Sequence, residues 1–272
     1  YPGYKGMGFS FPCRNVLPKP LQKPHPPLWM ACTNRDTIKV AAQNGIGALA
    51  FSFLDPDEAK AWSKIYYDII KSEECVPLGW SVNANLAMVS AFSMHEDRTE
   101  AIRRGQDNFE FFRYSQQKLV AEDFVPGYSN MWDEFKEKRG DASDRLIQAA
   151  LSRAEYDGAG IGTPDDMARH LREFQDVGID QVIFLQQAGR NTNQNIRESL
   201  ELFAKKVMPD FTKDVEEREA KKTKELAPYI EAALNRKEYM QPISREQVPV
   251  VKAAVKAATF DAQKMRQAAG DD

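Results

Sequence analysis

Four short apolar runs, separated by segments with helical spacing or helix-capping residues, constrain the fold of this chain more than any other feature. The runs lie at residues 28–32, 46–51, 76–83 and 179–185. Short runs with almost no polar alternation are typical of strands that are buried on both faces. Because helical segments come between the runs, the pattern predicts parallel strands in an α/β fold.

The segments between these runs carry the start signals of helices. Asp55 and Pro56 suit the cap and first position of one helix, and Thr163 and Pro164 suit those of another. Residues 1–27 are rich in proline, which predicts an extended loop. Apolar spacing predicts further helices at 38–43, 97–104, 109–119, 131–138, 144–154 and 193–208.

Four strands are half of the number that a closed barrel needs. A (β/α)8 barrel has eight strands in about 250 residues, whereas residues 1–210 supply four apolar runs. An open, doubly wound sheet is the alternative, but no G-x-G-x-x-G follows any of the runs, so a dinucleotide-binding fold has no support. Residues 211–272 carry a charge run at 216–225 and predict a solvated helical extension, which wraps either the sheet or a partner subunit.

The composition excludes several classes of function. A formal net charge of -3 gives no support for nucleic acid or an anionic membrane as the main partner. No apolar run approaches the roughly 20 residues of a membrane helix. The three cysteines lack C-x-x-C spacing, so neither a disulfide framework nor a metal site is expected, and a reducing, cytoplasmic location is the default.

Four segments, in this order along the chain, resemble the bacterial luciferase-like flavin-dependent monooxygenase family. The first, NVLPKPLQKPHPPLWMA at 15–31, is similar to a proline-rich insertion that re-enters the barrel as its fifth strand. The others are TNRDTIKVAAQNG at 33–45, GTPDDM at 162–167 with VGIDQVI at 177–183, and SLELFAKKVMP at 199–209. The set spans residues 10–211 with sensible spacing, and the tail after residue 211 adds little to it.

The resemblance implies that the four runs are strands five to eight of a (β/α)8 TIM-type barrel. Strands one to four would then lie upstream of Tyr1, together with the catalytic residues, which stay unknown here. The implied domains are residues 1–210, the C-terminal part of the barrel, and residues 211–272, the helical extension. His25 belongs to the proline-rich loop and does not replace the expected catalytic residues.

The activity that the resemblance implies is a two-component monooxygenase reaction. A separate flavin reductase would supply reduced FMN, and O2 would then oxidise a small organic substrate such as an aldehyde or alkane. A homodimer is expected by similarity. The rival readings are a deazaflavin-dependent oxidoreductase of the same superfamily and a non-catalytic flavin-binding relative or fragment.

Candidate site residues follow from the rule that barrel active sites lie at the C-terminal ends of the strands. Hydroxyl and amide groups at a helix start suit a phosphate, and the resemblance implies that the helix start after residue 32 holds the flavin phosphate. Helix capping, a turn or a surface loop are the alternatives at these positions. The predicted cofactor-binding residues are Thr33, Asn34, Thr37, Ser52, Gln187, Gly189 and Arg190.

Two further residues invite a chemical role but are assigned structural ones. Cys32 has no histidine nearby in the sequence and is predicted to be a small buried residue. Trp80 lies in the third predicted strand and is predicted to belong to the core. Asn83 and Asn85 lie in or just after the same run, where side chains of a regular strand alternate between its faces.

Overall fold

The computed structural model describes residues 1–50, 56–121, 125–139, 160–241 and 243–248. The chain divides into two compact units. Pro24–Lys237 forms the larger unit, and Tyr1–Lys23 with the residues from Glu238 onward forms the other. The predicted domain boundary after residue 210 stays a prediction.

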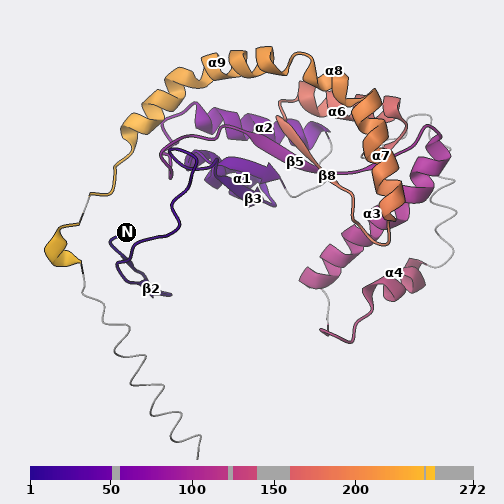
Figure 1. Cartoon of the computed structure of the whole chain (residues 1–272), viewed down its shortest axis with the longest axis horizontal. Coiled ribbons are helices and arrows are strands. Elements are labelled where there is room, and N and C mark those ends of the chain that lie inside the picture. Colours follow the sequence, from indigo (N-terminus) through magenta and orange to yellow (C-terminus); the bar gives the residue numbers. More distant parts are fainter. Residues whose placement is uncertain (51–55, 122–124, 140–159, 242, 249–272) are drawn as a thin grey trace, which may run out of the picture. The chain divides into compact units, whose positions relative to one another are not determined.

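A four-stranded parallel sheet lies at the centre of the larger unit (Figure 1). The strands pair in the order β3, β4, β5, β8, and the register joins Met30 to Ala48, Ala50 to Met88, and Met88 to Val182. The predicted α/β class with a parallel sheet is therefore confirmed. The strands are β3 (Trp29–Cys32), β4 (Gly47–Ala50), β5 (Leu86–Ala91) and β8 (Gln181–Leu185).

Helices follow the strands, and local capping explains where several of them begin. Thr163 accepts a hydrogen bond from the Asp166 amide, and Pro164 occupies the first turn of α6, as predicted. The helices of this unit are α1 (Arg35–Gln43), α2 (Pro56–Ile70), α3 (Arg98–Ala121), α4 (Met131–Arg139), α6 (Pro164–Asp176), α7 (Asn193–Lys206), α8 (Met208–Thr212) and α9 (Val215–Arg236).

Helices cover one face of the sheet. Side chains at alternate positions of β3, β4 and β5 form a single core with α1, α2 and α6. Tyr66 of α2 is fully buried, and its hydroxyl donates to the carbonyls of Ile46 and Asn83. Burial of each large apolar side chain contributes roughly 1.5–3 kcal/mol. The core residues from the strands and helices include Cys32, Ile38, Ala48, Trp62, Tyr66, Leu86, Met88 and Phe174.

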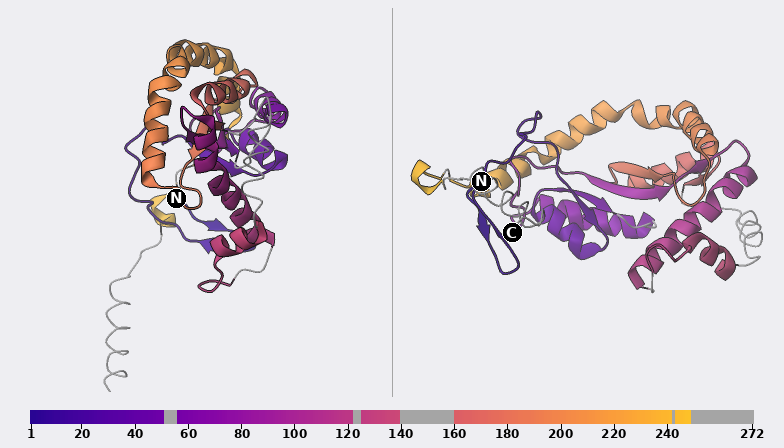
Figure 2. Two further views of the ribbon diagram at one scale, coloured as in Figure 1. Left: turned by 90° about the vertical axis from the view of Figure 1, so that its right-hand side faces the viewer. Right: turned by 60° about the horizontal axis from the view of Figure 1, so that its bottom comes forward.

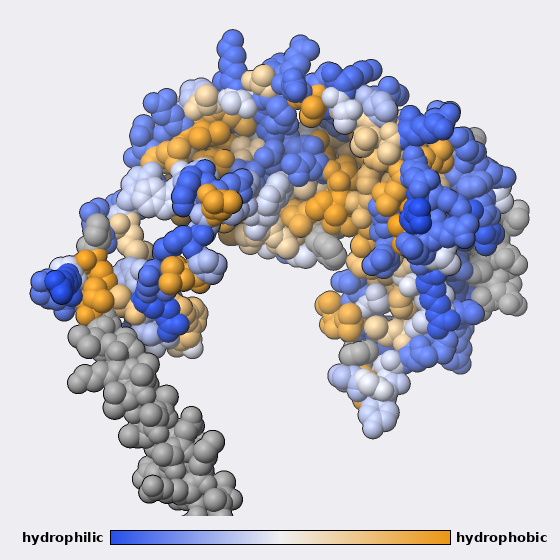
Figure 3. Space-filling model, in the orientation of Figure 1, coloured by the Kyte–Doolittle hydropathy of each residue, from blue (hydrophilic) through white to orange (hydrophobic). Residues whose placement is uncertain are grey.

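The opposite face of the sheet carries apolar side chains that these helices do not cover. The register and the alternation of side chains place Trp29, Leu49 and Ile183 on this face. Trp29 and Ile183 are 39% and 46% exposed, although both are large and apolar. Figure 3 shows hydrophobic surface in the region of β5 and β8. We call this surface the open face of the sheet.

Helix α9 lies across the N-terminal ends of the strands (Figures 1 and 2). Its Lys222 donates to Asp180, just before β8, at 2.6 Å, and to Asn85, just before β5, at 2.7 Å. Leu226 and Ala233 of the same helix are buried in the core. The charge run at 216–225 is therefore part of a helix, as predicted. The buried residues of that helix, Leu226 and Ala233, come after the charge run.

The third predicted strand is wrong in position. Residues 76–83 lie alongside the turn between α1 and β4 instead of forming a strand. The amides of Val76, Leu78 and Asn83 donate to the carbonyls of Gln43, Asn44 and Gly45 in that turn. Trp80 is 61% exposed rather than buried in the core. The strand is β5, which begins three residues after the end of the predicted segment, at Leu86, and all six of its residues are buried.

Other element predictions need smaller corrections. The two helices expected at 97–104 and 109–119 are one helix, α3, in which Gly105 lets the backbone approach Ser93 closely. Ser93–Met94 (β6) and Ile161–Gly162 (β7) pair as short parallel strands that the sequence did not indicate. Pro209 lies in the first turn of α8 instead of closing α7. The helix expected at 144–154 lies outside the described residues.

The smaller unit holds a hairpin in the segment predicted as an extended loop. Tyr4–Lys5 (β1) pairs antiparallel with Ser10–Phe11 (β2), and a 3-10 turn follows at Arg245–Gln247. Tyr1 and Phe11 meet edge to face within this unit. In neither unit is any described helix long and apolar enough to cross a membrane.

Candidate functional site

The loops in which the predicted site residues lie all follow the C-terminal ends of parallel strands. Residues 33–34 follow β3, residues 92–97 follow β5, and residues 186–192 follow β8. The loop after β4, with the predicted residue Ser52, lies outside the described residues. Loops at this end of a parallel sheet are where active sites of α/β barrels are found.

The start of α1 is organised by a capping box. The Asn34 side chain accepts from the Thr37 amide at 3.0 Å, and the Thr37 hydroxyl accepts from the amides of Thr33 and Asn34. The Thr37 hydroxyl also donates to the Asn34 carbonyl at 2.8 Å, so its hydrogen-bonding capacity is used within the box. Thr33 and Asn34 are exposed, so their remaining polar groups are more accessible to a ligand than the Thr37 hydroxyl is.

An anion fits this helix start. The first amides of a helix have no partner within it, and the helix dipole favours negative charge there. Arg35 lies in the same turn, but its guanidinium forms a two-pronged pair with Glu58, at 2.9 and 2.5 Å. The amides of Thr33, Asn34 and Thr37 are used within the capping box. The Thr33 hydroxyl, the Asn34 side-chain amide and the backbone amides of Arg35 and Asp36 are therefore the groups left for a phosphate, beside the Asp36 carboxylate in the same turn.

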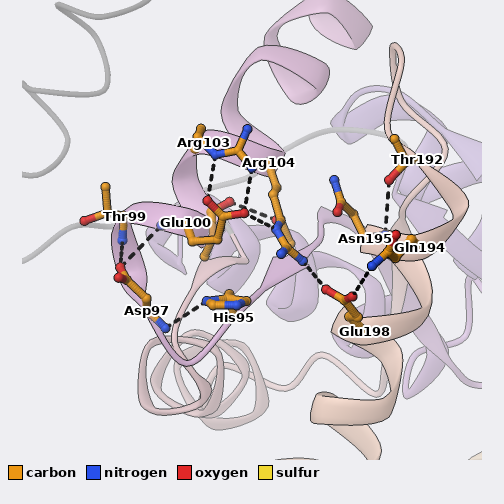
Figure 4. Close-up of polar contacts among 12 residues, drawn as sticks. His95, Asp97, Thr99, Glu100, Arg103, Arg104, Thr192, Gln194, Asn195 and Glu198 are labelled. Carbon is orange, nitrogen blue, oxygen red and sulfur yellow. Dashed lines mark hydrogen bonds and ion pairs between the residues drawn. The ribbon is translucent and has the colours of Figure 1, made fainter.

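After β5, polar residues lead into α3 (Figure 4). The Asp97 carboxylate accepts from the amide of Thr99 at 2.7 Å and from that of Glu100, and so caps the helix. The His95 Nδ1 accepts from the Asp97 amide at 3.0 Å, so the neutral ring carries its proton on Nε2. These contacts fix the loop between β5 and α3.

A chain of ion pairs joins α3 to α7 beside this loop (Figure 4). Glu100 accepts from Arg103 and Arg104, each at 2.6 Å, and Arg104 also donates to Glu198 at 2.5 Å. Hydrogen bonds from Arg103 and Arg104 lower the pKa of Glu100 to about 2. The Arg104 hydrogen bond likewise lowers the pKa of Glu198. Both carboxylates therefore stay charged at neutral pH.

After β8, the predicted residues Gln187, Gly189 and Arg190 are exposed. Gly189 has φ of +60°, a conformation that other residues adopt only with strain. The Arg190 amide donates to the Asn108 side chain of α3 at 2.7 Å, and the Arg190 guanidinium lies over the Trp132 ring of α4, 5.1 Å from its centroid. The loop is thus fastened to two helices.

A small cavity of about 10 Å³ lies below this loop, between the ends of β5, β7 and β8. Gln186 and Asn191 line it, and the side-chain oxygens of both are buried without a hydrogen-bond partner in the part of the chain that is described. A cavity of this size is near the lower limit for one water molecule. An ordered water that donates to both oxygens would satisfy them.

Buried polar residues elsewhere on the sheet have structural roles. Ser90 of β5 lies 2.9 Å from the Nε2 of His170 in α6, and both residues are buried. Cys32 is fully buried, as predicted, and burial raises the pKa of its thiol, which removes it further from nucleophile chemistry. His25 accepts from the Trp80 amide at 2.8 Å and so ties two surface loops together.

The predicted site residues fall into two separate groups. Thr33, Asn34 and Thr37 lie after β3 at one edge of the sheet, and Gln187, Gly189 and Arg190 lie after β8 at the other. The sequence did not indicate Asn108 or Trp132, which lie far along the chain from Arg190. Within the described residues, no three His, Cys, Asp or Glu come together as metal ligands would.

Comparisons with known proteins agree with this architecture. The family model for luciferase-like monooxygenases matches residues 4–181. Among solved structures, the monooxygenase RslO1 from Streptomyces bottropensis superimposes with a TM-score of 0.53 at 18% identity, over 77% of this chain and 56% of that one. This chain therefore spans little more than half the length of that relative.

A second solved structure aligns less closely. The coenzyme F420 dependent tetrahydromethanopterin reductase from Methanopyrus kandleri gives a TM-score of 0.45 at 19% identity, over 68% of this chain and 51% of that one. No functionally curated protein matches the sequence significantly. The likeness to RslO1 is one of fold, and the family match reaches from the N-terminal hairpin to the first residue of β8.

Proposed function

Because this chain belongs to the luciferase-like monooxygenase family, we propose that it is the cofactor- and substrate-binding part of a flavin-dependent monooxygenase. The family match over residues 4–181 carries the proposal, since it includes three of the four sheet strands and the capped start of α1. Reduced FMN from a separate reductase would supply the electrons with which O2 oxidises a small organic substrate, such as an aldehyde or alkane. The active protein would be a homodimer.

The sheet would form the second half of a (β/α)8 barrel, with β3, β4, β5 and β8 as its fifth to eighth strands. Three observations support this assignment. The strands pair in chain order, helices cover one face, and apolar side chains such as Trp29 and Ile183 lie on the open face. All-parallel sheets occur almost only where both faces are covered, so further strands closing over the open face would complete the fold.

The start of α1 would hold the FMN phosphate. The Thr33 hydroxyl and the Asn34 amide would donate to it together with the first backbone amides of α1. Thr37 would act indirectly, because its hydroxyl holds the Thr33 and Asn34 amides in the capping box. In the completed barrel the apolar face, once covered, would exclude water from the flavin ring, and the loop after β8 would line the substrate side.

FMN and riboflavin differ by the phosphate, so their relative affinities test this assignment. Thr33→Val is expected to weaken FMN binding about tenfold and to leave riboflavin binding unchanged, because one hydrogen bond to a charged group is lost. Asn34→Asp keeps a good helix cap but places a negative charge beside the phosphate, and is expected to weaken FMN further. Affinities would be measured by anaerobic titration of the reduced cofactors.

The matched control is Thr192→Asp. Thr192 caps α7 at the same end of the sheet, so this change makes the same kind of charged cap at a different helix start. It is expected to leave FMN binding unchanged. The titrations would use this chain and the longest natural reading frame that contains it, followed by O2 uptake measurements. Binding of a deazaflavin in place of FMN, or equal effects on FMN and riboflavin, would contradict the proposal.

A further inference from the structure

Arg190 differs from the other arginines near the C-terminal ends of the strands. Arg98, Arg103 and Arg104 all form ion pairs with carboxylates. Arg190 forms none with any carboxylate among the residues that the structure describes; its guanidinium lies over the Trp132 ring instead. A guanidinium over an aromatic ring keeps its N–H donors at its edge, so Arg190 presents a positive charge that no described carboxylate neutralises.

The loop that carries Arg190 is built to hold this position. The amide of Arg190 donates to Asn108, whose own amide group donates to the Arg104 carbonyl at 2.8 Å. At Gly189, a Cβ atom would lie 2.5 Å from the Asn108 side-chain oxygen and 2.9 Å from the Trp132 ring. Only glycine fits so close an approach at a positive φ. The backbone and the guanidinium of Arg190 are therefore both restrained before any ligand arrives.

Arg190 lies away from the proposed phosphate site. The strands β3 and β8 are the two edges of the sheet, three strand spacings of about 4.8 Å apart, or roughly 14 Å. Thr33 and Asn34 follow β3, whereas Arg190 is fastened to α3 and α4 on the β8 side (Figure 1). One phosphate group at the start of α1 therefore leaves Arg190 available for a different anion.

We infer that Arg190 binds the anionic group of the organic substrate, with Trp132 and Asn108 as its positioning residues. The inference rests on the proposed monooxygenase function and narrows its substrate class to organic anions. A carboxylate or sulfonate matches the fork of guanidinium N–H groups, which donate two parallel hydrogen bonds. An alkane offers no acceptor, and a neutral aldehyde offers one carbonyl oxygen but no charge to neutralise Arg190.

A pair of small probes tests the charge preference directly. 4-Fluorobenzoate and 4-fluorobenzamide have nearly the same shape but differ in charge, and fluorine NMR reports the binding of each. The longest natural reading frame that contains this chain is expected to bind the benzoate about tenfold more tightly, which is the effect of a charge-assisted hydrogen-bonded pair. Arg190→Gln is expected to abolish this difference, and Arg190→Lys to keep part of it.

Arg197 provides the matched control. It lies on α7, is exposed, and pairs with Glu201 one helical turn away. Arg197→Gln removes the same charge from the same region and is expected to leave the benzoate affinity unchanged. Equal affinity for the two probes in the unchanged protein, no binding of either, or an equal loss in the Arg190 and Arg197 variants would overturn the inference.

Two substitutions distinguish a positioning role of Trp132 from a general structural role: one keeps an aromatic ring, and the other removes it. Trp132→Phe keeps a ring under the guanidinium and is expected to keep most of the benzoate preference. Trp132→Leu removes the ring and is expected to lower benzoate affinity while benzamide affinity stays the same. Loss of affinity for both probes in Trp132→Leu would show that the residue only supports the fold.

Titration with FMN and riboflavin distinguishes a failure of this inference from a failure of the proposed function. If Arg190→Gln weakens FMN but not riboflavin, Arg190 contacts the cofactor phosphate, and the substrate assignment fails while the flavin proposal stands. If the unchanged protein binds no flavin but still prefers benzoate through Arg190, the anion site stands and the monooxygenase proposal fails. If FMN responds to Thr33→Val and benzoate responds to Arg190→Gln, both stand.

Discussion

At the scale of single residues, Gly189 determines the path of the loop after β8. Gly189→Ala adds a methyl group at φ of +60° and places it 2.5 Å from an Asn108 oxygen. We expect a loss of about 1–3 kcal/mol in the free energy of unfolding, from backbone strain plus the collision. Urea unfolding followed by circular dichroism measures it.

Gly127 separates the two causes of that loss. Its φ is +81°, but a Cβ atom there meets nothing within 4 Å. Gly127→Ala should therefore show only the conformational cost and destabilise the protein less than Gly189→Ala. If the free energy of unfolding falls equally in the two variants, the close packing of Gly189 against Asn108 and Trp132 does not contribute to stability.

Glu100 makes the stability of this region depend on pH. Hydrogen bonds from Arg103 and Arg104 hold its pKa at about 2, below its ordinary value of 4.5. A carboxylate with a lowered pKa stabilises the folded state above its unfolded pKa, and this stabilisation disappears as pH falls through the folded pKa. The thermal midpoint of the unchanged protein should exceed that of Glu100→Gln at pH 5–7, and the difference should shrink between pH 4.5 and 2. A pH-independent difference would contradict this.

Local chemistry of the site could be predicted from the sequence, and long-range contacts could not. Thr33, Asn34 and Thr37 lie within five residues, so their capping pattern is readable without a structure. Asn108 lies 82 positions before Arg190, inside a helix, and no local pattern shows that its side chain meets the Arg190 amide. The ion pair between Arg104 and Glu198 was missed for the same reason.

At the scale of elements, Lys222 strengthens the attachment of α9 to the sheet, beside the buried Leu226 and Ala233. The Lys222 ammonium bonds to Asp180 and Asn85, and both of its acceptors lie just before strands. Lys222→Met keeps the side-chain length but removes a charged donor, and should cost about 1.5–3 kcal/mol. Lys224→Met, on the exposed side of the same helix, is the control and should cost less than about 0.5 kcal/mol. Equal unfolding midpoints in urea for the two variants would contradict this role.

Elements with strong end signals were predicted correctly, and those defined by tertiary contact were not. The cap at Thr163 begins α6 where the sequence indicated. The helix predicted at 38–43 begins three residues earlier, at Arg35, with Asn34 as its cap. Residues 76–83 are as apolar as a strand, but their amides bond to the α1–β4 turn. The two helices predicted at 97–104 and 109–119 are one helix, α3, and Gly105 between them is a point of close approach to β6. Periodicity alone carries no information on which of these outcomes applies.

At the scale of the whole molecule, the open face offers a test of the half-barrel proposal. Ile183 is 46% exposed on this face, whereas Val89 beside it in the register is 4% exposed. In these 272 residues expressed alone, Ile183→Ser should leave the urea midpoint unchanged and reduce the binding of a hydrophobic dye, because exposed apolar surface is removed. Val89→Ser should be destabilising by about 1–3 kcal/mol.

A longer natural reading frame gives the decisive comparison. If added strands cover the open face, Ile183→Ser should become destabilising there by a similar amount to Val89→Ser. The chain alone should also show no monooxygenase turnover, because its open face cannot exclude water from a flavin. Turnover by the chain alone would contradict the half-barrel proposal.

The order of the strands along the chain also determines how long each strand waits for its partner during synthesis on the ribosome. Trp29 and its partner Gly47 lie 18 positions apart, and Ala48 and Leu86 lie 38 apart, but Met88 and Val182 lie 94 apart. Translation at about 5–20 residues per second separates the emergence of β5 from that of β8 by roughly 5–20 s. During this interval β5 is an apolar strand with an unpaired edge, which is where aggregation begins. The long segment between β5 and β8 therefore lengthens the period in which this edge of the nascent sheet is open to aggregation.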